Sequence, residues 1–144
     1  MATVARRSLP EASDPWEVQL RRGALELAIL AAHWSGRLYG WEIIRRLGEE
    51  RALNVPIGTI YPLLSRLKAN GLLSAEWVET KGGHPRKYYQ LTRAGRRRVV
   101  EMTRLWRSFA AGIDHLLAPV EIRRSSAFDA YGATSRPPLQ KKET

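Results

Sequence analysis

Residues 73–92 read LSAEWVETKGGHPRKYYQLT, and apolar and polar side chains alternate along both ends of this stretch. A period of two is typical of half-buried β-strands, so we expect strands over Leu73–Glu79 and Lys87–Leu91. The residues between them, Thr80–Arg86, include two glycines and a proline, which favour a turn. Two strands joined by such a turn form a hairpin, and we predict one from Leu73 to Thr92.

The chain before the hairpin has helical periodicity. Apolar residues recur at intervals of three and four in three segments: Trp16–Trp34, Trp41–Glu50 with Leu38-Tyr39-Gly40 as its opening, and a third from Pro56 to Asn70. Proline suits a first helical turn, and Asn70-Gly71 is a common helix end. Pro62 lies inside the third segment and removes one backbone hydrogen bond, so we expect a local distortion of that helix.

The chain after the hairpin predicts one long helix, Arg93–Leu117, with Thr92 as its cap. Apolar residues alternate at intervals of three and four along it for nearly three heptads; they are Val99, Met102, Trp106, Phe109, Ile113 and Leu116. We expect this face to be a dimer interface, because the three shorter helices can bury their own apolar faces. The alternative is packing of the helix on the core of its own chain.

The charge of the chain indicates a polyanionic partner. Lys and Arg number 24 against 14 Asp and Glu, which leaves a net charge of +10. Such a charge suits nucleic acid or an anionic membrane surface, although a generically basic protein is the alternative. There is no cysteine, no apolar run long enough to span a membrane and no secretory leader. We therefore expect a cytoplasmic protein without disulfides.

Three short helices followed by a hairpin are the order of a winged helix-turn-helix. The predicted fold is thus mainly α with a small β-hairpin, followed by a long C-terminal dimerisation helix. The expected divisions are a flexible N-terminal arm at 1–15, the DNA-binding domain at 16–92, the dimerisation helix at 93–118 and a flexible tail at 119–144.

The third helix is the predicted recognition helix. One of its faces carries short or basic side chains, which suit a helix lying in the major groove of DNA. The expected contacts are Gly58, Thr59, Tyr61, Ser65, Arg66 and Lys68.

The hairpin is the predicted wing, and it would reach the minor groove or the phosphate backbone. Its candidate contacts are Lys81, His84, Arg86 and Lys87. A solvated basic loop is the alternative.

Five segments together resemble the PadR family of bacterial transcription regulators. They are GALELAIL at 23–30, YGWEI at 39–43, GTIYPLLSRL at 58–67, NGLL at 70–73 and GGHPRKYYQLTRAG at 82–95. The resemblance covers about Arg22 to Leu117, and the third and fifth segments are specific in combination. The family tolerates proline at the position of Pro62. His84 and Pro85 depart from the Gly-Arg or Arg-Arg pair that is more frequent in the family's wing.

The resemblance implies a homodimeric repressor of the subgroup with a short C-terminal helix. In the family this helix packs against the first helix of the partner. A dimer would suit double-stranded DNA with a palindromic operator. In one multidrug-sensing branch, a tryptophan at the position of Trp106 lines a pore and stacks on flat drugs. Trp106, Phe109, Met102 and Trp34 are therefore candidates for a small aromatic effector site, unless Trp106 only fills the interface.

Other classes of function have less support in the sequence. His33, His84 and His115 lack the spacing of metal ligands, so we expect no metal and no cofactor. No nucleophile or paired-carboxylate pattern indicates an enzyme. The main prediction is a sequence-specific repressor relieved by an aromatic or drug-like effector. The alternative is a winged-helix interaction module that docks an acidic protein.

Overall fold

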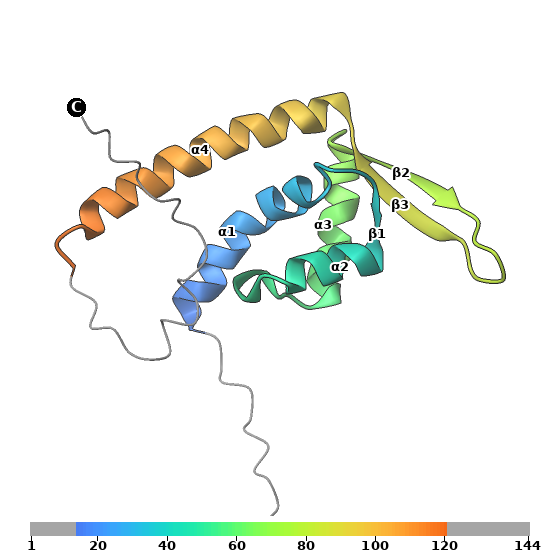
Figure 1. Cartoon of the computed structure of the whole chain (residues 1–144), viewed down its shortest axis with the longest axis horizontal. Helices are drawn as coiled ribbons and strands as arrows, with labels where there is room; N and C mark the ends of the chain where they lie inside the picture. Colours follow the sequence, from blue (N-terminus) through green and yellow to red (C-terminus); the bar gives the residue numbers. More distant parts are fainter. Residues whose placement is uncertain (1–13, 121–144) are drawn as a thin grey trace, which may run out of the picture. The chain divides into compact units, whose positions relative to one another are not determined.

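A computed structural model describes residues 14–120 of the chain (Figure 1). The elements in order are α1 (Pro15–Ala32), β1 (Leu38–Tyr39), α2 (Gly40–Gly48), the 3-10 helix η1 (Arg51–Leu53), α3 (Ile57–Ala69), β2 (Leu73–Val78), β3 (Arg86–Leu91) and α4 (Arg93–Leu117). The predicted class, mainly α with a small hairpin in a winged helix-turn-helix, is confirmed. The predicted arm and tail lie almost entirely outside the described residues, and Pro15 already belongs to α1.

The chain divides into two compact units, one ending at Ser108 and the other beginning at Phe109. Helices α1, α2 and α3, the sheet and the core all belong to the first unit. In α3 the buried residues Ile60, Leu64 and Leu67 recur at intervals of four and three, so the helix buries one face and exposes the other. The full core is Leu25, Ile29, Leu30, Ile43, Leu47, Ile60, Leu64, Leu67, Leu73, Tyr89 and Val99.

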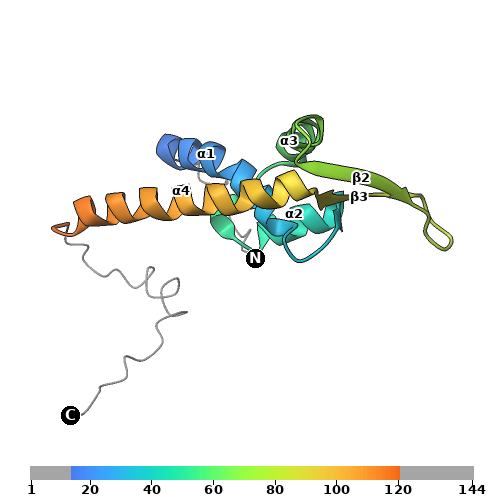
Figure 2. The same ribbon diagram turned by 90° about the horizontal axis from the view of Figure 1, so that it is seen from above.

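The hairpin is part of a three-stranded antiparallel sheet with the order β1-β3-β2. Its register runs from Leu73 opposite Leu91 to Val78 opposite Arg86. Figure 2 shows that the hairpin extends well beyond helices α1, α2 and α3. It therefore has the shape of a wing.

One sequence expectation is wrong at the start of α2. Leu38 and Tyr39 form strand β1 opposite Tyr89 and Tyr88, and the helix begins only at Gly40. The physical reason is tertiary, because β3 offers a free edge to which these two residues add a strand. The Tyr39 backbone N–H also donates to the Glu42 carboxylate at 3.1 Å, and this contact helps to end the strand and start the helix.

The end of α3 and the start of α4 are joined through Thr92. Its hydroxyl accepts from the Gly95 N–H at 2.9 Å and donates to the Gly71 carbonyl at 2.6 Å, so the predicted cap is confirmed. Gly71 has a φ of +73°, which suits the left-handed end of α3. Helix α3 continues through Pro62 to Ala69. This junction sets where α4 leaves the domain.

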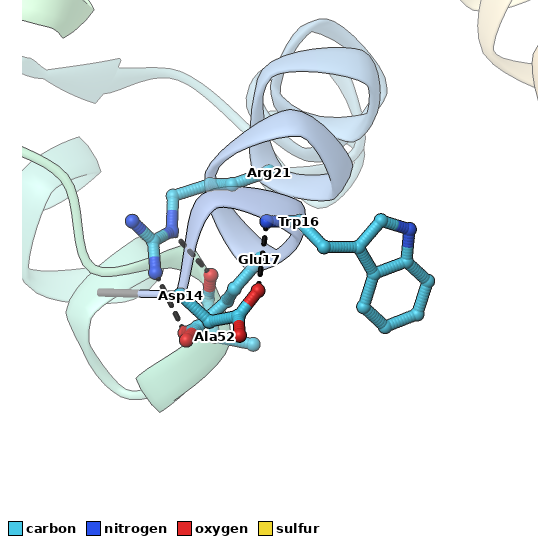
Figure 3. Close-up of polar contacts among 5 residues, drawn as sticks. All are labelled: Asp14, Trp16, Glu17, Arg21 and Ala52. Carbon is cyan, nitrogen blue, oxygen red and sulfur yellow. Dashed lines mark hydrogen bonds and ion pairs between the residues drawn. The ribbon is translucent and has the colours of Figure 1, made fainter.

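Polar contacts tie the first turn of α1 to η1 (Figure 3). The Asp14 carboxylate accepts from the Trp16 N–H at 2.8 Å and caps the helix. Arg21 donates to the Ala52 carbonyl at 2.8 Å and pairs with Glu17 at the same distance. These contacts hold the beginning of α1 against the loop that precedes α3.

The described residues include no helix with the length and apolar character that a membrane crossing requires.

Candidate nucleic-acid interface

The exposed face of α3 carries all six residues predicted for the recognition helix. Gly58, Thr59, Tyr61, Ser65, Arg66 and Lys68 are exposed, whereas the leucines between them are buried or half-buried. This separation follows from the helical period, because residues three and four apart share a face. Small side chains gather toward the N-terminal end of α3 and basic ones toward its C-terminal end. The face can therefore approach a polyanion closely at one end and pair with it at the other.

Two of these residues also contact neighbouring helices. The Tyr61 ring lies against Gly40, so close that any side chain at position 40 would clash with it. The Arg66 guanidinium pairs with the Glu26 carboxylate of α1 at 3.5 Å. Both partners of this pair are solvent-accessible, so the pair contributes little stability and leaves Arg66 free to exchange it for a phosphate.

A groove between α1 and α3 extends the cationic surface beyond the predicted residues. It has a volume of about 430 Å³, and Arg22, Thr59 and Arg66 are among the residues that line it. Arg22 is exposed on α1 and was missed by sequence reasoning. The signal that could have found it is its position four residues before Glu26, which places both on one face of α1.

The tip of the wing is a tight turn that presents Lys81 and His84 to solvent. The Thr80 hydroxyl donates to the His84 carbonyl at 3.1 Å, and Gly82 has a φ of +72°. A side chain at Gly83 would lie 2.8 Å from the Thr80 hydroxyl, which would have to turn away. Figure 1 shows the tip projecting away from α3. The two sets of candidate contacts thus lie on one unit but at separate places.

Arg86 and Lys87 point to opposite faces of the sheet, as neighbours in a strand must. The Arg86 guanidinium lies 4.5 Å from the centre of the Tyr39 ring. On the same face, the Arg37 guanidinium lies 4.6 Å from the centre of the Tyr88 ring and pairs with Glu76. This face is a row of cations held on aromatic rings.

Lys87 is half-buried and occupies the other face of the sheet. Its ammonium group lies 5.8 Å from the Trp77 ring and 5.5 Å from the Tyr89 ring. The two basic residues that the sequence placed together therefore face different surroundings, and Arg86 is the more exposed of the pair.

The six residues predicted for a dimer interface differ in their burial. Val99 belongs to the core of its own chain and Met102 packs against that core, so Val99 is removed from any surface available to a second copy. Both lie within the first three turns of α4, where the helix still covers the domain. Trp106, Phe109, Ile113 and Leu116 are exposed by 41 to 72%.

The predicted effector residues do not all line one hollow. Trp106 and α1 form an apolar groove of about 370 Å³, with Leu20, Ala24, Leu27 and Leu53 among its lining residues. Trp34 lines a different hollow, on the arginine-rich start of α4. Both hollows belong to the first unit.

His33 is the one buried polar residue of the described core. One of its ring nitrogens, Nδ1, lies 2.7 Å from the Ile29 carbonyl, and Nε2 is buried without a partner among the described residues. Burial is the main cause that lowers the pKa of His33, and the Arg46 charge adds to it. The ring is therefore neutral. Residues 14–120 contain no group of three or more His, Asp or Glu that could hold a metal ion.

Comparisons with known proteins agree on one family. The model described as "Transcriptional regulator PadR-like family" matches residues 27–101, just over half of the chain. A PadR-like transcription factor structure from Bacteroides fragilis is 42% identical with a TM-score of 0.60, and the match covers 72% of this chain and 99% of that one. A PadR family regulator from Eggerthella lenta is 33% identical with a TM-score of 0.63, covering 71% and 88% of the two chains.

A curated relative is also a transcriptional regulator. The transcriptional regulator Rv3488 of Mycobacterium tuberculosis is 34% identical over 83 residues, which is 58% of this chain and 76% of that protein.

Proposed function

Because the chain belongs to the PadR-like family of transcriptional regulators and is a DNA-binding regulator, we propose that it is a dimeric repressor of a palindromic operator. The observation that carries the proposal is the exposed face of α3. Its short and basic side chains are exposed, whereas its leucines are buried or half-buried. A helix with this face suits the major groove, where short side chains allow close approach and Arg66 can reach a guanine edge or a phosphate.

The wing and the groove beside α1 supply contacts to the DNA backbone. Lys81 at the wing tip and Arg86 on its side are exposed, and Arg22 borders the α3 face. These contacts carry no sequence information, but they orient the protein on the duplex. Each phosphate that they neutralise releases counterions, so affinity falls steeply as salt rises.

We propose that a second copy of the chain packs over the apolar groove between α1 and Trp106. Almost the whole lining of this groove is apolar, and Phe109, Ile113 and Leu116 of α4 are also exposed. Exposed apolar residues concentrated in this way mark interfaces. Two copies related by a two-fold axis would present two α3 helices to the two halves of a palindromic operator.

The same groove is the proposed site of a small aromatic effector. Its volume of about 370 Å³ falls in the usual range of ligand pockets, and the Trp106 ring offers a surface for stacking. An effector bound beside the dimer contact would change the spacing of the two α3 helices and release the operator.

A gel-shift series tests the repressor proposal. The wild-type protein and Arg66→Ala are titrated against the region upstream of the protein's own gene and against random DNA of equal length. Wild type should prefer the upstream region, and Arg66→Ala should weaken that binding by about 1–3 kcal/mol, or roughly 5- to 150-fold. Arg45→Ala on α2 is the matched control and should bind as wild type does. Equal affinity of wild type for both DNAs would contradict sequence-specific repression.

The effector part needs a separate titration. A planar cationic dye should quench tryptophan fluorescence in wild type and quench it less in Trp106→Ala. Equal quenching in the two proteins would show that the groove is not the site.

A further inference from the structure

A hollow on the outer surface of α4 carries a second cluster of positive charge. It has a volume of about 630 Å³ and lies where the end of α1 meets the first three turns of α4. Its charged and aromatic lining residues are Trp34, Arg96, Arg97, Arg98, Glu101 and Arg104, and Leu72, Ala94 and Val100 complete the lining. None of these residues belongs to the α3 face or to the wing. The hollow is therefore separate from the proposed DNA interface.

The positive charge of this hollow is not balanced within residues 14–120. Its one acid, Glu101, pairs with Arg98 at 2.9 Å. Arg97 and Arg104 form no ion pair with any residue in that range, and both are exposed. Neighbouring like charges repel one another, so the cluster is electrostatically unfavourable until an anion binds it.

Trp34 adds a flat aromatic surface to this cluster. The residue follows the end of α1 and is 45% exposed, as the other tryptophans of the chain also are to a similar or greater degree. The Arg96 guanidinium lies 5.0 Å from the centre of its ring and reaches its backbone carbonyl at 3.5 Å. Arg96 occupies one face of the indole, so a planar ring would have to stack on the other face.

The spacing of the free arginines indicates an anion with more than one charged group. Arg97 and Arg104 are seven residues apart on α4, which is two turns and about 10 Å along the helix. A carboxylate or a single phosphate reaches one guanidinium fork, whereas linked phosphates can bridge two. The volume of the hollow also lies within the usual range for a bound small molecule.

We propose that this hollow binds a nucleotide with two or three phosphates, its base stacked on Trp34 and its phosphates held by Arg97 and Arg104. The three features that carry the assignment are an aromatic platform, cations without ion-pair partners two turns apart and a hollow between them. Bound phosphate would remove the repulsion along the start of α4 and stabilise the folded chain.

Calorimetric titration of the full-length protein tests the site, with ATP and inorganic triphosphate as probes at about 150 mM salt. Arg97→Gln combined with Arg104→Gln should weaken binding of both probes at least about tenfold. Trp34→Leu should weaken the binding of ATP and leave the binding of inorganic triphosphate unchanged, because only ATP has a base that can stack on the indole. The melting temperature of wild type should rise with ATP.

A matched control exists on α2, where the Arg45 guanidinium lies 5.6 Å from the ring of exposed Trp41. Trp41→Leu combined with Arg45→Gln removes an equivalent pair that lines none of the hollows described above, and should leave ATP binding unchanged. Arg66→Ala and Lys81→Gln, on the DNA face, should also leave it unchanged. Circular dichroism confirms that each variant is folded.

Several outcomes would overturn the proposal. One is no detectable binding of ATP at about 1 mM. Another is that the Arg66 or Lys81 variant loses ATP binding while the Arg97/Arg104 variant keeps it. That result would place the anion on the DNA face. Equal binding of ATP and triphosphate with no effect of Trp34→Leu would indicate an adventitious ion only. Binding of a single-stranded oligonucleotide but not ATP would assign the surface to nucleic acid.

Discussion

His33 is an uncharged, polar side chain inside an otherwise apolar core. Its Nδ1 faces the Ile29 carbonyl at 2.7 Å, which requires the proton on that nitrogen, and its buried Nε2 would have to take up a second proton to become charged. Desolvation opposes that charge, and Arg46 on α2 opposes it further. The pKa of His33 therefore lies below its ordinary value of 6.5.

The lowered pKa predicts that the protein loses stability in mild acid. The unfolded chain takes up a proton at His33 more readily than the folded chain does, so this contribution is complete above about pH 6.5 and is lost as pH falls below it. Chemical denaturation at pH values from about 7.5 down to 5 should show a falling free energy of unfolding. His33→Leu should remove part of this slope, and His84→Leu, at an exposed position, should not. Identical slopes in wild type and His33→Leu would refute the assignment.

The Tyr39 ring supports the Arg86 side chain of the wing. Its ring lies under the Arg86 guanidinium at 4.5 Å and meets the Tyr88 ring edge-on at 5.4 Å. An exposed cation on an aromatic ring is held by about 0.5–1 kcal/mol, so the ring restricts where Arg86 can point.

Replacing the ring should weaken DNA binding by a small, measurable factor. Tyr39→Leu should lower affinity about 2- to 5-fold, as expected for the loss of one cation–π contact. Tyr39→Phe keeps the ring and should bind as wild type does. Fluorescence anisotropy with labelled operator measures both. If Tyr39→Phe lost as much affinity as Tyr39→Leu, the hydroxyl rather than the ring would be the important group.

At the scale of elements, the junction between α3 and α4 depends on Gly95. A side chain there would run into the Leu72 backbone carbonyl and the Leu91 side chain, because the first turn of α4 lies directly on the end of α3. Thr92 closes the same junction through the Gly71 carbonyl. One glycine and one hydroxyl thus hold the start of α4 close to the segment that follows α3.

Adding a methyl group at this junction should destabilise the protein. Gly95→Ala should cost about 1–3 kcal/mol, because backbone atoms cannot move aside as a side chain can. Gly112→Ala is the matched control in the same helix, where a side chain would meet nothing within 4 Å. It should be neutral or stabilising by up to about 1 kcal/mol, because alanine favours helix more than glycine does. Urea denaturation compares the two, and equal effects would contradict the close contact.

At the scale of the whole molecule, the chain presents apolar surface that its own core does not cover. The groove beside Trp106 is apolar, and Phe109, Ile113 and Leu116 are exposed further along α4. Water contact with such side chains costs free energy that association would recover. A dimer is the arrangement that the proposed operator symmetry also requires.

A charge on the exposed apolar side of α4 should separate the two copies. Ile113→Glu should shift the protein to monomer in sedimentation at micromolar concentration, because an unpaired carboxylate would be buried in the interface. His115→Glu, two residues further on and exposed, introduces the same charge on another side of the helix and should stay dimeric. A wild-type protein that sediments as a monomer would refute the dimer, and an Ile113→Glu dimer would place its interface elsewhere.

Most of the elements could be predicted because their signals are local. The bounds of α4, Arg93–Leu117, agree with the prediction. Each of the two hairpin strands, β2 and β3, differs from its predicted range by one residue. Helical and strand periods arise from neighbours within a few residues, so they can be read without knowing the fold. The sorting of α3 into a leucine face and a small, basic face follows from the same period.

The sequence by itself thus determined the winged-helix order, the exposed face of α3 and the family. Only the tertiary structure decided which residues distant in the chain meet: β1 on β3, Arg66 on Glu26, Arg86 on Tyr39 and Val99 in the core. The same packing brought Trp34 beside Arg96, 62 residues away. The physical reason is that these contacts depend on how the elements pack together, and no local period encodes that packing.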